Sequence, residues 1–228
     1  MRIASRVAAP ESDLTARARI REAAITCFAT EGFGASFATI AKGAGVSPGL
    51  ITHHFGSKVA LRAECDIEVL RRYQATKSDG LANPSGYLLD NVPDPSVTAT
   101  LLVYILRAVH AGGRGAQEFL EHLVDAAREA MKANVEAGIV RPSRDEEARL
   151  RYLTYQGIGA LLVELLTMPD ATPAEFYSAA LASQRNQILP VLELFTEGLL
   201  TTRQMLDHYL NYVGDPPSAD APVDDATA

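Results

Sequence analysis

Apolar residues recur every three or four positions along most of this chain of 228 residues, and this spacing is that of one face of an α-helix. No convincing segment alternates apolar and polar residues, and no two segments are joined by a hairpin turn. The pattern therefore predicts an all-α fold. The predicted helices cover about residues 14–30, 37–43, 48–55, 58–77, 97–111, 115–137, 145–167, 172–199 and 201–213.

Residues suited to helix ends stand where several of these segments begin and stop. Serine and aspartate side chains accept hydrogen bonds from the free N–H groups of a first turn, and glycine adopts the left-handed conformation that closes many helices. Pro48 suits the first position of its helix, whereas Pro190 predicts a kink or break inside 172–199. The predicted N-caps are Asp13, Ser36, Ser47 and Ser57, and the predicted stops are Gly32 and Gly56.

Composition divides the chain into three parts. The segment "SDGLANPSG", residues 78–86, has the glycine, proline and serine content of a linker. It separates a predicted N-terminal domain, residues 14–74, from a second helical domain, residues 81–213. Residues 214–228 are acidic and lack the apolar side chains that would offset the entropy of ordering them, so they are predicted to form a disordered tail.

Charge is distributed unevenly between the two domains. Residues 1–80 hold 11 Lys/Arg and 8 Asp/Glu, a balance of +3, whereas residues 81–228 hold 10 and 20, a balance of −10. A polyanion is repelled by a strongly acidic surface. Only the N-terminal part is therefore expected to accept nucleic acid.

The compartment follows from what the chain lacks. No uncharged apolar segment approaches the roughly 18 to 20 residues of a membrane helix, and the first residues lack the apolar core of a signal peptide. We expect a soluble, cytoplasmic protein with no membrane partner. Cys27 and Cys65 fit a reducing compartment, and their apolar helical surroundings disfavour a redox-switch disulfide between them.

The stretch "GVSPGLITHHFGSK", residues 45–58, follows a short predicted helix through a glycine-containing turn. Two short helices joined in this way predict a helix-turn-helix. In the second of them, Ile51 and Phe55 are four residues apart and face the core. At about 100° per residue, Gly49 and His53 then point into solvent.

The two adjacent histidines raise the question of a metal site or a catalytic base. His53 and His54 diverge by about 100°, with His54 near the buried edge, whereas helical metal pairs are three or four residues apart. Neither has a Cys, Asp or Glu at such a spacing within the stretch, and no pocket-forming partner for a base is nearby. An idle polar surface stays open as an alternative. The major groove of DNA accounts for more: Gly49 permits close approach, Thr52 and His53 offer hydrogen bonds, and Leu50 offers contact with a thymine methyl group.

Residues 14–73 resemble the DNA-binding domain of the tetracycline-repressor (TetR) family. The resemblance is carried by "RIREAAITCFATEGFGASFATIAKGAGVSPGLITHHFGSKVAL", in which the first helix ends in Phe28 and "EGF". "TIAKGAGVS", Gly49, "HHF" and "SK" follow in order. The resemblance implies an all-helical homodimer, with an N-terminal three-helix reading head and a C-terminal domain that binds a small effector and dimerises.

Carried over onto this sequence, the resemblance places ten residues at or near a double-stranded DNA operator. Lys58 also follows from charge, because a capped first turn and an ammonium group suit a phosphate. The family often has Thr or Ser where Leu50 stands, and Tyr where Thr52 stands, so we expect sparser base hydrogen bonding and more reliance on DNA shape. The ten are Ser36, Thr39, Ser47, Pro48, Gly49, Leu50, Thr52, His53, His54 and Lys58.

Beyond residue 80 the resemblance is one of architecture. It implies a homodimer interface formed by the helices at 145–167 and 172–199, and an ordinary intrachain core is the alternative. Gly157, Gly159 and Ala160 would let a partner helix come close. The apolar residues predicted on the second helix are Phe176, Leu181, Ile188, Leu192 and Phe195.

Effector contacts are predicted from polar and aromatic side chains within apolar helices, because ligand cavities combine mostly apolar walls with a few polar groups. Glu118 and His122 have the spacing of metal ligands, but no third ligand is in view, so we predict neither a metal nor any cofactor beyond a small-molecule effector. The predicted contacts are Tyr104, Arg107, His110, Phe119, His122 and Tyr155.

These observations predict a DNA-binding transcriptional regulator, and not an enzyme. We expect a repressor that binds a palindromic operator as a dimer and is released by its effector. One alternative is a helical enzyme or ligand carrier, although the sequence has no nucleophile–base pair or phosphate-binding loop. Another is a protein-interaction module that has lost specific DNA binding.

Overall fold

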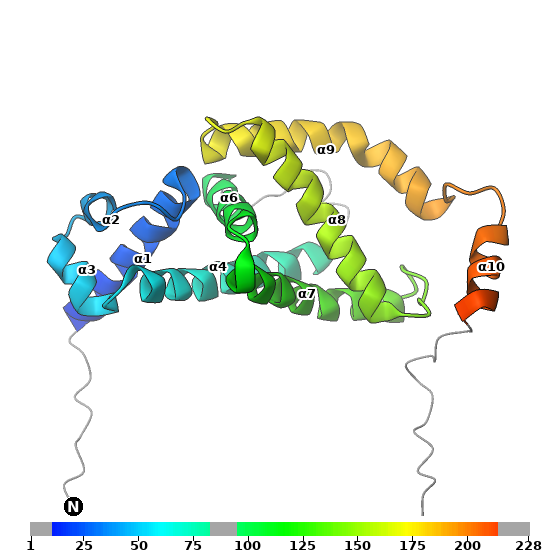
Figure 1. Ribbon diagram of the computed structural model, residues 1–228, viewed down its shortest axis with the longest axis horizontal. Coiled ribbons are helices and arrows are strands. Elements are labelled where there is room, and N and C mark those ends of the chain that lie inside the picture. Colours follow the sequence, from blue (N-terminus) through cyan, green and yellow to red (C-terminus); the bar gives the residue numbers. More distant parts are fainter. Residues whose placement is uncertain (1–10, 83–94, 214–228) are drawn as a thin grey trace, which may run out of the picture.

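The computed structural model describes residues 11–82 and 95–213, which form helices joined by short turns, with no strand among them (Figure 1). This confirms the predicted all-α fold. The predicted tail, 214–228, and the second half of the predicted linker lie outside the described residues. The helices are α1 (Glu11–Glu31), α2 (Phe37–Ala44), α3 (Pro48–Phe55), α4 (Lys58–Ala82), α6 (Pro95–His110), α7 (Gly113–Glu136), α8 (Glu146–Thr167), α9 (Pro173–Thr196) and α10 (Gln204–Val213).

Two predicted boundaries are wrong. Helix α1 begins at Glu11, so Asp13 lies in its first turn and is not its N-cap. Helix α4 continues to Ala82, so the linker does not begin at residue 78; one helical glycine costs only about 1 kcal/mol and need not end a helix. Of the kink or break predicted at Pro190, the structure has no break: helix α9 passes through this residue and bends in Figure 1, since a curved helix accommodates the missing N–H.

Caps define the helix-turn-helix as the sequence predicted. The Ser36 and Ser47 side chains accept hydrogen bonds from the third backbone N–H groups after them, at 3.0 and 3.3 Å, and so begin α2 and α3. Gly45 ends α2 with φ 64°, which is the left-handed region that an L side chain rarely adopts. Ile51 and Phe55 of α3 are buried, as expected. The backbone of the turn therefore fixes how α3 projects from the molecule.

Ion pairs join α1 to α4. Glu68 is buried apart from 8% of its surface, and the guanidinium of Arg71, followed by those of Arg72 and Arg21, lowers the pKa of its carboxyl group to about 2. A lowered pKa means that the stabilisation is present at neutral pH and is lost as the pH falls from about 4.5 towards 2. The pairs between the two helices are Arg17–Glu64, Arg21–Glu68 and Arg72–Glu22.

Helix α6 is the centre of the molecule, because it packs against α1, α4, α7, α8 and α9. One of its faces, with Tyr104 and Ile105, belongs to a core cluster shared with α1, α2, α3, α4 and α7. Its other face, with Val103 and Leu106, belongs to a second cluster that contains Phe176 of α9. The hydrophobic core is thus continuous from the reading head, α1–α3, into the C-terminal helices.

Candidate nucleic-acid interface

Helix α3 presents one face to solvent. Pro48, Gly49, Thr52 and His53 are exposed, which matches the orientation predicted from the helical period. Leu50 lies beside this face and is half-buried against the core cluster. Less of its side chain is therefore available for a base. The exposed surface of α3 is narrow and carries a glycine at its centre.

The hydroxyl groups around this face already have partners within the chain. The Ser36 and Thr39 hydroxyl oxygens lie 3.0 Å apart at the start of α2. The Thr52 hydroxyl donates to the Pro48 carbonyl at 3.4 Å. Such bonds are readily exchanged at an exposed site, so these residues keep the capacity to contact phosphate groups.

Lys58 begins α4, but its ammonium group reaches towards α2. The Nζ atom donates to the Gly34 carbonyl oxygen at 3.2 Å, just before the N-cap Ser36. The cation therefore lies near the start of α2, where the first N–H groups of a helix lack partners within the helix. Both features favour an anion such as a DNA phosphate.

Arg17 holds α3 against the rest of the reading head, a role that the sequence pattern does not indicate. Its Nη1 donates to the His54 carbonyl at 2.7 Å, its Nε donates to Glu64 at 3.2 Å, and its guanidinium carbon lies 4.6 Å from the centre of the Phe55 ring. One side chain thus links α1, α3 and α4. His54 is half-buried at the edge of the core, as predicted, and its ring meets that of His53 edge-on at 5.4 Å.

Two side chains of α6 connect the C-terminal helices to the reading head. Arg107 donates to the Ala29 carbonyl at 2.8 Å and to the Thr30 carbonyl at 3.2 Å. These carbonyls belong to the last turn of α1. The last carbonyl groups of a helix have no N–H partner within the helix, and a cation is favourable there. One turn earlier on α6, the Tyr104 hydroxyl donates to Asp66 of α4 at 2.6 Å. We call these five residues the interdomain joint.

Aromatic rings and a second arginine surround the interdomain joint. The Phe33 ring meets the Tyr104 ring edge-on at 5.4 Å, and the Arg62 guanidinium lies 3.7 Å from the centre of Phe33. Burial raises the pKa of the Asp66 carboxyl group, while the Tyr104 hydrogen bond and Arg62 act in the opposite direction. Buried polar groups with satisfied partners fix one arrangement of their elements. The joint therefore sets how α1 and α4 sit on α6.

The predicted effector residues are spread over several environments. Tyr104 and Phe119 belong to the same buried cluster, whereas Arg107 contacts the end of α1. All six remain predictions as effector contacts. The structure adds that Tyr104 and Arg107 hold the reading head on α6. The other three, His110, His122 and Tyr155, are exposed.

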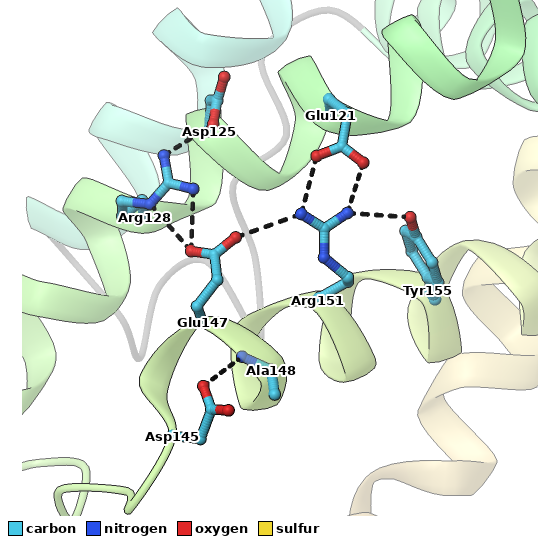
Figure 2. A network of polar contacts seen from close by, with 8 residues as sticks. All are labelled: Glu121, Asp125, Arg128, Asp145, Glu147, Ala148, Arg151 and Tyr155. Atoms are coloured by element: carbon cyan, nitrogen blue, oxygen red, sulfur yellow. Dashed lines mark hydrogen bonds and ion pairs between the residues drawn. The ribbon is translucent and has the colours of Figure 1, made fainter. Parts of the chain in front are cut away.

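Tyr155 takes part in a network of charged groups between α7 and α8 (Figure 2). Arg151 donates to Glu121 at 2.8 Å, to Glu147 at 3.3 Å and to the Tyr155 hydroxyl at 3.2 Å. Arg128 of α7 reaches Glu147 at 2.9 Å from the other side. Because most of these groups are exposed to solvent, the network contributes little to stability.

Both cysteines are free thiols, and burial raises the pKa of each, that of Cys65 strongly. A raised pKa disfavours the thiolate, which is the reactive form. Within residues 11–82 and 95–213, no three His, Cys, Asp or Glu side chains are arranged to hold a metal ion. No helix in the described part of the chain is both long and apolar enough to cross a membrane.

Comparison with known proteins agrees with the helix-turn-helix geometry. Residues 20–65 match the model of bacterial regulatory proteins of the tetR family, and residues 97–201 match the model of the tetracyclin repressor-like C-terminal domain. The chain is 39% identical over 200 residues to the HTH-type transcriptional regulatory protein RaaS of Mycobacterium tuberculosis (strain ATCC 25618 / H37Rv), covering 87% of this chain and 93% of that protein. A crystal structure of a TetR-family transcriptional regulator from Rhodococcus sp. has the same fold, with a TM-score of 0.50 and 21% identity over 75% of this chain and 97% of that one.

The reading head with its exposed α3 and the helical C-terminal domain define a DNA-binding transcriptional regulator. The chain belongs to the TetR family. The resemblance noted in the sequence is thereby confirmed. The individual DNA-contacting residues remain predictions, supported by the exposure of α3.

Proposed function

We propose that the protein is a dimeric repressor, which binds a palindromic operator and leaves it when a small molecule binds the C-terminal domain. The observation that carries the proposal is the exposed face of α3, held by caps at both ends and by Arg17. A recognition helix presented in this way enters the major groove, and a two-fold dimer matches two half-sites about one helical turn apart. The acidic C-terminal helices would remain outside the groove.

Dimerisation through α8 and α9 is supported by apolar side chains that the chain leaves uncovered. Tyr152 and Val163 of α8 have exposed fractions of 65% and 63%, and Phe195 of α9 has 59%. A Cβ atom added to Gly157 or Gly159 would meet nothing within 4 Å, so the fold of one chain does not require these glycines. Space beside small residues is what a closely packed partner helix uses. Phe176 differs from the prediction, because it is buried in the intrachain core.

The test is a fluorescence anisotropy titration on the intergenic DNA beside the protein's own gene, repeated over a series of salt concentrations. We expect saturable, sequence-selective binding whose affinity falls steeply as salt increases, because phosphate contacts release counterions. Binding without sequence preference, or no binding to any genomic fragment, would favour a protein-interaction module instead.

Lys58→Ala is expected to weaken DNA binding by a similar factor on all sequences, and to reduce the slope of log affinity against log salt by about one. The physical reason is the loss of one cation beside the start of α2. Titration of operator and unrelated DNA measures both quantities. Lys132→Ala, at an exposed position on α7, is the matched control and should change neither. A change in specificity at constant slope would contradict the assignment of Lys58 to a phosphate.

Release by an effector requires that the ligand prefers a dimer whose reading heads are wrongly spaced. The interdomain joint offers a direct route, because a displacement of α6 moves Arg107 at the end of α1 and Tyr104 at α4 together. Coupling between two binding equilibria is reciprocal, so operator DNA would weaken effector binding by the same factor. Paired titrations, in which each ligand is varied at fixed concentrations of the other, measure both factors.

Arg107→Ala is expected to lower the free energy of unfolding by about 1 to 2 kcal/mol and operator affinity several-fold, because two carbonyls lose a charged donor and the head is no longer fixed on α6. Urea denaturation and anisotropy measure the two effects. Arg107→Lys should recover part of both. Arg114→Ala, whose ion pair with Glu118 is exposed, is the control that should change neither. Unchanged operator affinity in the destabilised Arg107→Ala variant would remove the joint from the transmission route.

A further inference from the structure

Helix α10 has a sharply divided surface. At about 100° per residue, its six apolar residues fall within about 160° of the circumference, and its four polar residues occupy the rest. None of the ten is buried, and the exposed fraction of Tyr212 is 88%. The apolar residues are Met205, Leu206, Tyr209, Leu210, Tyr212 and Val213.

A helix of this length needs a surface to pack on. Ten residues are fewer than the roughly 12 to 15 at which an isolated helix becomes marginally stable in water. Within the described part of its own chain, α10 packs extensively against no other helix. Figure 1 shows it beyond the end of α9, at the opposite end of the molecule from α1–α3. Its partner therefore lies elsewhere.

The second half of α9 has more apolar surface than one neighbour covers. Between residues 188 and 195 only Pro190 and Glu193 interrupt it, and the apolar side chains span about 220° of the circumference. One packed neighbour uses a stripe of about 100°. All residues from 189 to 196 are exposed. A single facing helix across the proposed dimer interface would thus leave a second apolar stripe uncovered.

We propose that α10 of each protomer packs its apolar face on the second half of α9 of a second copy of this chain, so that two C-terminal arms are exchanged reciprocally. The inference rests on the proposed dimer and extends it beyond α8 and α9. Leu199 and Leu200, with exposed fractions of 81% and 61%, connect the two helices and make the apolar surface continuous with the proposed interface. In a two-fold symmetric dimer the same contact between α10 and α9 occurs twice, so both arms are covered.

Charge distinguishes a second copy from other occupants. Helices that lie on membranes carry Lys or Arg on their polar face. The polar face of α10 has neither. DNA is disfavoured by the balance of −10 over residues 81–228. The apolar face of α10 instead matches the exposed apolar surface of α9. The polar residues of α10 are Gln204, Asp207, His208 and Asn211.

Cysteine cross-linking tests the exchange. Leu192→Cys and Tyr209→Cys, which lie within the two apolar faces, are combined with Cys27→Ala in the full chain. Isotopically labelled and unlabelled protomers are mixed and treated with a short bismaleimide. We expect a product of twice the chain mass on denaturing gels, in which mass spectrometry finds the peptide around residue 192 of one protomer joined to the peptide around residue 209 of the other. In the matched control, Asn211→Cys on the polar face replaces Tyr209→Cys, and the 192-to-211 cross-link should be at least tenfold less abundant than the 192-to-209 cross-link.

The outcomes separate the two proposals. A cross-link within one chain, or none, in a protein that sediments as a dimer would overturn the arm exchange and leave the dimer through α8 and α9 intact. A wild-type protein that sediments as a monomer would overturn both. As a second readout, Tyr209→Asp should raise the dimer dissociation constant at least tenfold, and an unchanged constant would also contradict the exchange.

Discussion

Gly49→Glu is expected to abolish specific DNA binding, with a loss of at least about 100-fold in affinity, while the fold is retained. In the free protein a Cβ atom at position 49 would meet only the Ser47 hydroxyl oxygen, at 3.9 Å, so the side chain has room. In the groove the same side chain would occupy the space that lets the backbone approach the bases, and its carboxylate would face phosphate groups. Like charges brought together at an interface cost several kcal/mol, which corresponds to this loss.

Stability is expected to change little or to increase in this variant. Position 49 is in the first turn of α3, where an acidic side chain is favourable, and a helical glycine is less favourable than other residues by up to about 1 kcal/mol. Urea denaturation and operator anisotropy measure stability and binding separately. Gly49→Ala should retain affinity within about tenfold. Gln117→Glu, which adds the same charge at an exposed position of α7, should bind as the wild type does. Normal operator binding by Gly49→Glu would show that this face of α3 is not on DNA.

Much of the reading head could be predicted because its signals are local. A serine before each short helix, glycines after them, and the four-residue spacing of Ile51 and Phe55 each act within one turn of backbone. Such signals do not depend on what else the chain packs against. How far Leu50 is buried could not be predicted, because the depth of the core at that edge depends on neighbouring helices.

Contacts between distant elements were harder to predict. Arg107 and Tyr104 were recognised as unusual residues in an apolar helix, but their partners lie on α1 and α4, at separations of 78 and 38 residues. The sequence contains one usable signal for such a contact: Arg17 and Arg21 on α1 have the same spacing as Glu64 and Glu68 on α4. Matched spacings of opposite charge predict two helices side by side. The apolar width of α9 and α10 was likewise visible, but which side stays uncovered depends on the packing of the whole chain.

Val163→Asp is expected to convert the dimer into monomers and to lower operator affinity at least about 100-fold. The side chain is 63% exposed on α8, so a carboxylate there is solvated in the monomer and costs little, but it would be buried without a partner in the dimer. A monomer binds one half-site only. It loses the gain in affinity that arises when the second reading head of a dimer is held close to the second half-site, which is a factor of roughly 10² to 10⁴. Sedimentation velocity and anisotropy on full and half operators measure the two effects. Half-site affinity should remain that of the wild type, because α3 is unchanged.

Ile67→Asp, at a similarly exposed position on α4, is the control for charge and should stay dimeric. If Val163→Asp remains a dimer with normal operator affinity, the interface does not include this face of α8.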